Sequence, residues 1–206
     1  MSSGYATFYQ SRIAPYFIHG GCSMRTFARM RERIIPKVCG VVAEIGFGSG
    51  LNLPYYDPTK VGRLIGIDPD PAMLGIARKR LVDFRRPIEL IEGRAENLPL
   101  ANGSADTAVV TYALCTIPDP AGALREIRRI LKPGGRLLFI EHERSAEPWR
   151  GRWQERLNGV WGRIAGGCHL NRTPAAAHRK RRLRHRPSGA GALPAAPVAA
   201  GHAIRW

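Results

Sequence analysis

The chain has 206 residues, which is enough for one domain with a sizeable hydrophobic core. No run of about 18 apolar residues occurs, and the N-terminus lacks a basic segment followed by an apolar one. We therefore expect neither a membrane span nor a secretion signal. The four cysteines form no C-x-x-C pair, which argues against a metal site or a disulfide framework and favours reduced thiols in the cytoplasm.

The net charge is +16, a value typical of nucleic-acid-binding proteins. The distribution of the charge argues against that function. All 16 acidic residues lie at or before Glu155, whereas residues 171–206 carry eight Arg or Lys residues and half of the excess charge. We expect no specific nucleic-acid partner, although binding that survives removal of the residues after Arg172 would revive this alternative.

Residues 1–40 are expected to form a helical lead-in. Ile13, Phe17 and Ile18 can share one apolar face. A basic face is formed by Arg25, Arg29, Arg31, Arg33 and Lys37. The residues alone leave two interpretations of the basic face: it is solvated, or it contacts an anionic membrane surface as a peripheral site.

Residues 41–140 alternate between apolar runs and helical patterns. Strands are predicted at 41–45, 63–67, 88–92, 107–111 and 136–141, with helices near 71–84 and 121–130. This alternation predicts an α/β fold with a mainly parallel sheet and helices on both faces. Asp70 and Pro71 fit the cap and first position of the second helix, and residues 132–135 predict a turn between the last helix and its strand.

The most informative segment is the glycine-rich one after the first strand. Glu44 is followed by Gly46, Gly48 and Gly50, and the next strand ends at Asp68. Glycines at a strand end allow a sharp turn and close approach of the backbone to a ligand. An acidic residue that closes the next strand can accept hydrogen bonds from ribose hydroxyls. The segment therefore predicts a nucleoside cofactor.

Two cofactors compete for this segment. A dinucleotide fingerprint, which would indicate an NAD-type oxidoreductase, places its third glycine where this chain has Leu51. Glu44 would also repel a pyrophosphate, whereas an acidic lip suits the sulfonium and ammonium groups of S-adenosylmethionine. The residues favour S-adenosylmethionine over NAD.

At this point the chain resembles the class I S-adenosylmethionine-dependent methyltransferases, and its central part resembles their type 11 domain. The similar blocks are residues 44–50, 66–74, 92–100, 105–117 and 131–142, and the resemblance covers about residues 8–173. Residues 114–119 and 167–172 are similar to one branch, the bacterial lipid and quinone methyltransferases and small thiol methyltransferase-like proteins. The resemblance implies a Rossmann-like three-layer α/β/α sandwich and methyl transfer to a small-molecule or lipid acceptor, without a metal.

The resemblance also implies that the lead-in helices cover the acceptor side of the cofactor pocket, and it implies roles for individual residues. Glu44 would lie near the cationic end of the cofactor, Asp68 at the ribose, and Pro69 and Met73 beside the adenine. The full set of implied cofactor-binding residues is Glu44, Gly46, Phe47, Gly48, Gly50, Asn52, Asp68, Pro69, Met73, Ala95, Glu96, Thr111 and Tyr112.

No catalytic residue is assigned, because in-line methyl transfer depends mainly on proximity and alignment. His142, at the end of the fifth strand, is a candidate general base for an amine or hydroxyl acceptor, and a thiolate would need none. Core packing is the favoured interpretation of Cys115, and Tyr112 is open between packing and the site.

The last segment departs from the family. Residues 174–206 are basic and rich in Ala, Pro and Gly, and they lack strand alternation. Reading plausible codons for residues 178–187 in a shifted frame gives Ile-Glu-Ser-Ala-Gly-Phe-Asp-Ile-Asp, which is family-like. We therefore expect a disordered, frameshifted segment, a missing C-terminal hairpin, and an unstable chain that could be an inactive cofactor-binding remnant. The coding DNA would test the frameshift.

Overall fold

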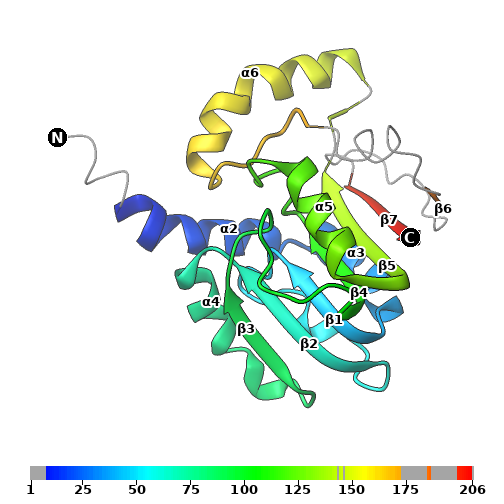
Figure 1. The fold of residues 1–206 in the computed structure, drawn as a ribbon. Coiled ribbons are helices and arrows are strands. Elements are labelled where there is room, and N and C mark those ends of the chain that lie inside the picture. The colour runs from blue at the N-terminus through cyan, green and yellow to red at the C-terminus, as the bar shows by residue number, and fades with distance from the viewer. Residues whose placement is uncertain (1–7, 143, 146, 173–184, 187–198, 206) are drawn as a thin grey trace.

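The computed structural model describes residues 8–142, 144–145, 147–172, 185–186 and 199–205. Five strands form the parallel part of one sheet (Figure 1). They are β1 (Gly40–Ile45), β2 (Val61–Asp68), β3 (Ile88–Glu92), β4 (Ala105–Thr111) and β5 (Leu131–His142). In space these strands lie in the order β3-β2-β1-β4-β5. The chain therefore adds β2 and β3 on one side of β1, and β4 and β5 on its other side.

Helices cover both faces of the sheet because alternate strand residues point to opposite faces. One face carries Ala43, Ile45 and Val110, which pack with Leu124 and Ile127 of α5 (Pro120–Ile130). The other face packs against α3 (Arg25–Ile34) and α4 (Pro71–Arg78). Its core includes Val42, Leu64, Val109, Met30, Ile34 and Leu74. The predicted three-layer α/β/α architecture is confirmed.

The remaining described elements lie around this sandwich. The lead-in contains η1 (Tyr9–Ile13), α2 (Ala14–Cys22), α3 and η2 (Ile35–Lys37), so its described residues are mostly helical. Short turns η3 (Leu53–Tyr55) and η4 (Leu81–Asp83) follow β1 and α4. A long helix that the sequence did not predict, α6 (Pro148–Ile164), lies beyond the end of the sheet (Figure 1).

The start of α4 and the start of β5 differ in how well their local sequence predicts them. Asp70 caps α4 as expected, because its side chain accepts hydrogen bonds from the backbone nitrogens of Ala72 and Met73, and Pro71 follows at the first position. The turn expected at 132–135 instead lies within the bounds of β5. The pairing of β4 with β5 shifts register between Ala105 and Thr107, so this segment is an irregularity in the strand.

The prediction of a missing C-terminal hairpin is wrong. Strand β7 (Ala199–Arg205) pairs antiparallel with β5, and β6 (His185–Arg186) pairs antiparallel with β7. Strand pairing uses backbone groups, and residues 199–205 contain no proline to interrupt the ladder. The disorder expected for residues 174–206 is wrong for these two strands, and its remaining part, residues 174–184, 187–198 and 206, lies outside the described residues. The frameshift stays a hypothesis about the DNA.

Candidate functional site

The glycine segment forms a tight turn at the carboxyl end of β1. Gly46, Gly48 and Gly50 have φ values of 72°, 57° and 73°, a region that residues with a side chain rarely adopt. A Cβ on Gly46 would overlap the Cβ of Ala113, which follows β4. The backbone nitrogens of Gly46 and Phe47 both bond to the carbonyl of Ile67, at 2.9 and 3.0 Å. The turn is therefore held tightly between the ends of β2 and β4.

Asp68 connects this turn to the end of β2. Its Oδ2 accepts a hydrogen bond from the backbone nitrogen of Gly48 at 2.8 Å, and its Oδ1 accepts one from Asp70 at 2.9 Å. Burial raises the pKa of this carboxyl, and the two backbone hydrogen bonds oppose that rise. A carboxylate oxygen has two lone pairs, so each one retains acceptor capacity for a hydroxyl group.

Glu44 is a buried support of the site. Its side chain is 1% exposed, so the acidic lip expected from the sequence is wrong. Oε1 accepts a hydrogen bond from Asn52 at 2.8 Å, and Oε2 accepts one from Tyr56 at 2.6 Å. Burial raises the pKa of Glu44 from 4.5 to about 7, although the hydrogen bonds and Arg31 oppose the shift. Glu44 therefore fixes the neighbouring loop through Asn52 and Tyr56.

Asn52 links Glu44 to two further elements. Its amide donates to the Thr111 hydroxyl at 3.0 Å, and its carbonyl oxygen accepts from Arg31 Nε, also at 3.0 Å. Arg31 is 4% exposed and lies 5.3 Å from the centre of the Tyr112 ring. The lead-in helix α3 is thereby joined to the ends of β1 and β4.

The exit from β4 has an unusual backbone conformation. Tyr112 has a φ of 55°, the only positive value among the described non-glycine residues. Its ring packs edge-on against Phe27 of α3 at 4.8 Å. Glu141 Oε1 accepts hydrogen bonds from the backbone nitrogens of Ala113 and Leu114, at 2.9 and 2.8 Å. Backbone strain held in place by several contacts is typical of functional sites.

The expected adenine side is formed by loops after β2 and β3. Pro69 is exposed, whereas Met73 and Ala95 are buried at 9% and 7% exposure. The Glu96 carboxylate contacts the backbone nitrogen of Asp119 at 3.4 Å and Arg94 at 3.7 Å. Pro69, Ala95 and Glu96 therefore lie on loops and Met73 on α4, and their contact with a ligand remains a prediction.

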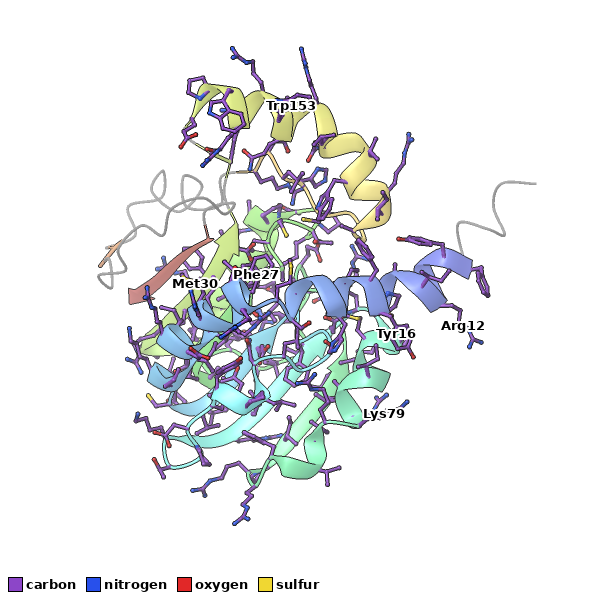
Figure 2. The ribbon with its side chains drawn as sticks, turned by 180° about the vertical axis from the view of Figure 1, so that it is seen from behind. Arg12, Tyr16, Phe27, Met30, Lys79 and Trp153 are labelled. Carbon is purple, nitrogen blue, oxygen red and sulfur yellow. The ribbon has the colours of Figure 1, made fainter. Side chains whose placement is uncertain are left out.

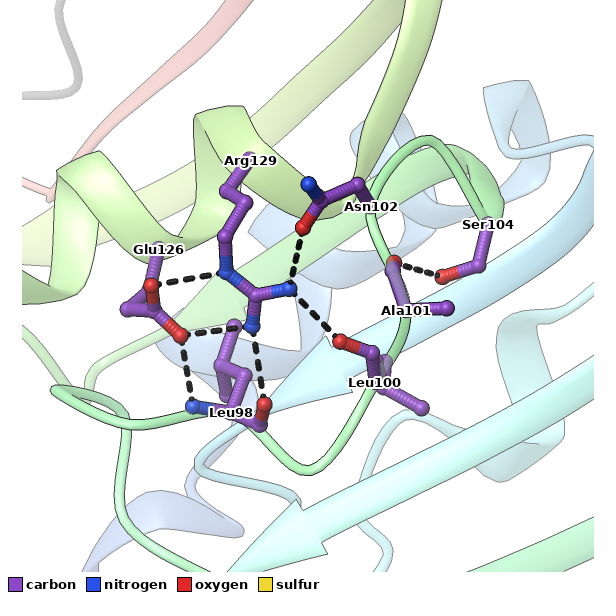
Figure 3. Close-up of polar contacts among 7 residues, drawn as sticks. All are labelled: Leu98, Leu100, Ala101, Asn102, Ser104, Glu126 and Arg129. Carbon is purple, nitrogen blue, oxygen red and sulfur yellow. Dashed lines mark hydrogen bonds and ion pairs between the residues drawn. The ribbon is translucent and has the colours of Figure 1, made fainter.

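A network centred on Arg129 anchors the loop that follows Glu96 (Figure 3). Arg129, on α5, donates to the carbonyl oxygens of Leu98 and Leu100 at 2.9 and 2.7 Å. It also forms two hydrogen bonds to Glu126, whose carboxylate accepts from the Leu98 nitrogen. These bonds hold both ends of the segment 98–100 in one position.

The side chain of Phe47 is part of the hydrophobic core. Its side chain is 3% exposed and belongs to the core on the α3 side of the sheet. A Cβ on Gly66 would lie only 2.6 Å from the Phe47 ring, so Gly66 makes room for it. Only the backbone of Phe47 is left to line a ligand.

Cys115 is packed against a second thiol. Its Sγ lies 3.6 Å from Cys168 Sγ, and both residues are buried. The contact with Cys168 and burial raise the pKa of the Cys115 thiol well above its ordinary value. A thiol held in its neutral form is a poor nucleophile, which supports the packing interpretation. His142 is the last residue of β5, and its role as a general base remains a prediction.

Several of these residues carry no recognisable signal in the sequence. Arg31 was expected on a basic face, because a buried arginine cannot be distinguished from a solvated one by its spacing. Tyr56 belongs to no motif, and Glu141 lies in the similar block 131–142 without a role that the sequence assigns to it. Ser49 lies inside the glycine segment, and its hydroxyl lies 2.7 Å from His19 Nδ1 of α2. The signals for Glu141 were the block 131–142 and its position at the end of an apolar run.

The described part of the chain offers neither a metal site nor a membrane span. No group of three or more His, Cys, Asp or Glu residues is arranged to hold a metal ion there. None of the helices described is both long and apolar enough to cross a membrane.

Comparison with known proteins gives consistent results. Residues 43–139 match the model of the family described as "Methyltransferase domain". The human thiol S-methyltransferase TMT1A is 33% identical over 153 residues, covering 71% of this chain and 61% of that protein. The demethylmenaquinone methyltransferase of Lactococcus lactis is 40% identical over 88 residues, covering 42% of this chain and 35% of that protein. The chain thus spans less than two thirds of the length of these curated relatives.

Solved structures share the fold. A methyltransferase from Thermotoga maritima, described as S-adenosylmethionine-dependent and a possible histamine N-methyltransferase, superposes with a TM-score of 0.60 and 25% identity. The superposition covers 100% of this chain and 98% of that one. An S-adenosylmethionine-dependent methyltransferase from Aquifex aeolicus gives a TM-score of 0.60 at 15% identity and covers 93% of this chain and 97% of that one.

Proposed function

Because residues 43–139 of this chain belong to the methyltransferase domain family, we propose that it transfers a methyl group from S-adenosylmethionine to a small-molecule or lipid acceptor. The observation that carries the proposal is the bond between Gly48 and Asp68 within the turn of positive-φ glycines. This bond places two features at the same edge of the sheet. One is a glycine backbone that a ligand can approach closely, and the other is a carboxylate that can still accept hydrogen bonds from a ligand. The comparisons give no support to the NAD-type alternative.

The residues present suit this cofactor. S-adenosylmethionine, when bound, supplies an activated methyl group on a sulfonium. Asp68 would accept hydrogen bonds from the ribose hydroxyls, and the backbone of Gly46, Gly48 and Gly50 would lie along the ligand. Met73, Pro69, Ala95 and Glu96 would border the adenine. Glu44 and Asn52 would act by holding this shape, and Thr111 and Tyr112 would face the methionine portion.

The chain's own contribution to the reaction is alignment. Holding the acceptor atom in line with the methyl group accounts for about 7–11 kcal/mol of barrier reduction in favourable intramolecular cases. The rigid turn, the strained Tyr112 backbone and the Glu141 hydrogen bonds supply such a fixed frame. A thiolate acceptor needs no base, and for a hydroxyl or amine acceptor His142 is the proposed base.

The organisation of the chain supports an acceptor site between the lead-in and the domain. We take residues 1–40 as a lead-in and 41–173 as the cofactor-binding domain. His19 of α2 contacts Ser49, and Arg31 of α3 contacts Asn52, so both helices reach the glycine loop. A cytoplasmic location and peripheral contact with a membrane complete the proposal.

Transfer of radiolabelled methyl groups tests the function. The purified chain is incubated with labelled S-adenosylmethionine and a panel containing an alkyl thiol, a demethylated quinol and a phospholipid. We expect label on one acceptor class, inhibition by S-adenosylhomocysteine, and loss of transfer in Asp68→Ala. Binding of NAD in place of S-adenosylhomocysteine would overturn the proposal.

A further inference from the structure

Helix α6 has its polar side inward and its apolar side outward. The side turned toward the rest of the protein carries Gly151, Gln154, Asn158 and Gly162, which are buried or half-buried. The side-chain oxygen Oε1 of Gln154 accepts a hydrogen bond from the backbone nitrogen of Ser145 at 2.7 Å. The side-chain oxygen Oδ1 of Asn158 accepts one from the backbone nitrogen of Leu170 at 2.8 Å. A helix of a water-soluble domain usually shows the opposite arrangement.

The outward side is a continuous apolar stripe. It consists of Trp149, Trp153, Leu157, Val160, Trp161 and Ile164, which are between 37% and 57% exposed. Their spacing of three and four residues places them on one face of the helix. Figure 2 shows Trp153 on α6 at one end of the molecule. A single exposed apolar residue needs no explanation, but a stripe along a whole helix indicates an interaction surface.

Basic side chains border the apolar stripe. Helix α6 contains four arginines and one acidic residue, Glu155. Arg152 and Arg156 are exposed, and Arg156 lies 5.9 Å from the centre of the Trp153 ring. Tryptophan beside arginine is favoured where an apolar layer meets a negatively charged polar layer, because the ring is buried and the guanidinium stays at the polar side.

The lead-in extends this surface. Tyr9 of η1 donates a hydrogen bond to the carbonyl of Ile164, the last residue of α6, at 3.0 Å. Ile13, Tyr16 and Phe17 are 46%, 64% and 47% exposed, so the apolar face expected in the lead-in is largely uncovered. No acidic residue occurs in η1 or α2, which contain Arg12. The lead-in therefore adds apolar and basic groups near the end of the stripe.

We propose that the apolar stripe of α6, with the neighbouring η1 and α2, docks the protein on a membrane surface that contains anionic lipid. The stripe inserts among the headgroups, and Arg152 and Arg156 contact lipid phosphates or carboxylates. Charge complementarity selects this occupant over a second copy of the chain, because two such helices would bring their arginines together.

Docking has a consequence for the acceptor, and this part rests on the proposed function. The segment after α6 returns to the site: the His169 nitrogen bonds to the Cys115 carbonyl at 3.1 Å. Arg172 donates to the carbonyls of Leu114 and Ile117 at 2.9 and 2.7 Å. The loop after β4 therefore lies next to the segment that follows α6, the helix proposed to dock on the membrane. The acceptor is a membrane-dissolved or amphipathic compound that reaches this loop from the lipid surface.

Vesicle sedimentation tests the docking surface. The full chain is mixed with phosphatidylcholine vesicles that either contain or lack phosphatidylserine. We expect binding to the anionic vesicles, weakening with added salt, and a blue shift of tryptophan fluorescence. Trp153→Ser/Leu157→Ser should reduce the partition coefficient at least about tenfold, as expected for losing two inserted side chains. Val82→Ser, at a residue 86% exposed on η4, is the control and should bind as the wild type does.

A second variant tests the charge. Arg152→Gln/Arg156→Gln should weaken binding to anionic vesicles, whereas Arg78→Gln/Arg85→Gln, which removes two exposed arginines elsewhere, should have a smaller effect. Equal binding of the wild type to both kinds of vesicle, or to neither, overturns the proposal. So does unchanged binding of Trp153→Ser/Leu157→Ser. A dimer in sedimentation velocity that the same variant dissociates, without vesicle binding, would assign the stripe to a second copy.

The docking inference and the proposed function fail separately. Each variant is also titrated with S-adenosylhomocysteine in the absence of vesicles, where an intact site should bind normally. A wild type that binds anionic vesicles but transfers no methyl group retains the docking surface and loses the function. A wild type that methylates a soluble thiol without binding vesicles retains the proposed function and loses the docking surface.

Discussion

Asp68 and Gly48 are joined by a hydrogen bond of 2.8 Å that connects the end of β2 to the glycine turn after β1. The bond aligns a buried carboxylate with a backbone that has no Cβ at its tightest point. The same carboxylate orders Asp70, the cap of α4. One side chain thus positions the turn, the next helix and a set of acceptor lone pairs for a ribose.

Replacing Asp68 should therefore impair cofactor binding strongly. Asp68→Ala removes the acceptor for the ribose hydroxyls and the support of Gly48. We expect the affinity for S-adenosylhomocysteine to fall about ten- to a hundredfold, as for hydrogen bonds to a charged group. Isothermal titration calorimetry measures this. Glu89→Gln, which removes an exposed carboxylate paired with Arg63, is the control, and an equal loss in both variants would contradict the assignment.

The tight packing of Gly46 against Ala113 predicts that a change at Ala113 restores the stability lost by a change at Gly46. Gly46→Ala must adopt a positive φ and overlap Ala113, so we expect a destabilisation of at least about 2 kcal/mol. Gly103 has a φ of 59°, and no atom lies within 4 Å of the place that a Cβ would take, so Gly103→Ala bears only the conformational cost. Adding Ala113→Gly should restore much of the stability of Gly46→Ala in urea unfolding. No rescue would mean that this contact is not the cause.

Glu44 should make stability depend on pH. Its pKa of about 7 in the folded protein exceeds its ordinary value of 4.5, so the folded state holds the proton more tightly than the unfolded state. This contribution is fully present below pH 4.5 and is lost as the pH rises to about 7. It amounts to at most about 3 kcal/mol.

Glu44→Gln tests this prediction. The carboxamide can accept from Asn52 and donate to Tyr56 without a charge, so the variant should flatten the fall in unfolding free energy across this pH range. Urea unfolding at a series of pH values gives the slope, with Glu89→Gln as an exposed control. An unchanged slope in Glu44→Gln would refute the assignment.

Arg129 should matter for both stability and binding. Arg129→Lys keeps the charge but cannot reproduce the hydrogen bonds to Leu98, Leu100 and Glu126 together. We expect a loss of about 1–3 kcal/mol in unfolding free energy and a weaker affinity for S-adenosylhomocysteine, since the loop after Glu96 loosens. Thermal unfolding and calorimetry check the two effects. Arg125→Lys, at an exposed ion pair with Asp119, is the matched control on α5.

Cys115 is predicted to be dispensable for the chemical step. Cys115→Ala should retain most of the methyl-transfer rate and lose stability through the small cavity beside Cys168. Single-turnover kinetics with labelled S-adenosylmethionine separates the two effects. A labelled protein thiol in the wild type, absent from Cys115→Ala, would instead indicate a covalent intermediate.

The sequence predicted the parts of the fold that rest on local pattern. The strand at Ile88–Glu92 was placed at its observed bounds, and Asp70 with Pro71 identified the start of α4. Both depend on residues close in sequence. The glycine turn was identified for the same reason, since its residues and Asp68 lie at fixed spacing.

The errors concern long-range contacts. Glu44 looked like an acidic lip because its partners Tyr56 and Arg31 come together only in the folded protein. Helix α6 was not predicted because its apolar spacing marks an outward face and its inward face is polar. The C-terminal strands pair through their backbones with β5, a contact that the Ala- and Gly-rich sequence does not indicate.

The central claim is that the glycine turn and Asp68 bind S-adenosylmethionine, and calorimetric titration of the purified chain with S-adenosylhomocysteine tests it most directly. We predict saturable binding at one site per chain in the wild type, marked weakening in Asp68→Ala, and no competition by NAD. Absence of binding by the folded wild type, or equal affinity in Asp68→Ala, would contradict it.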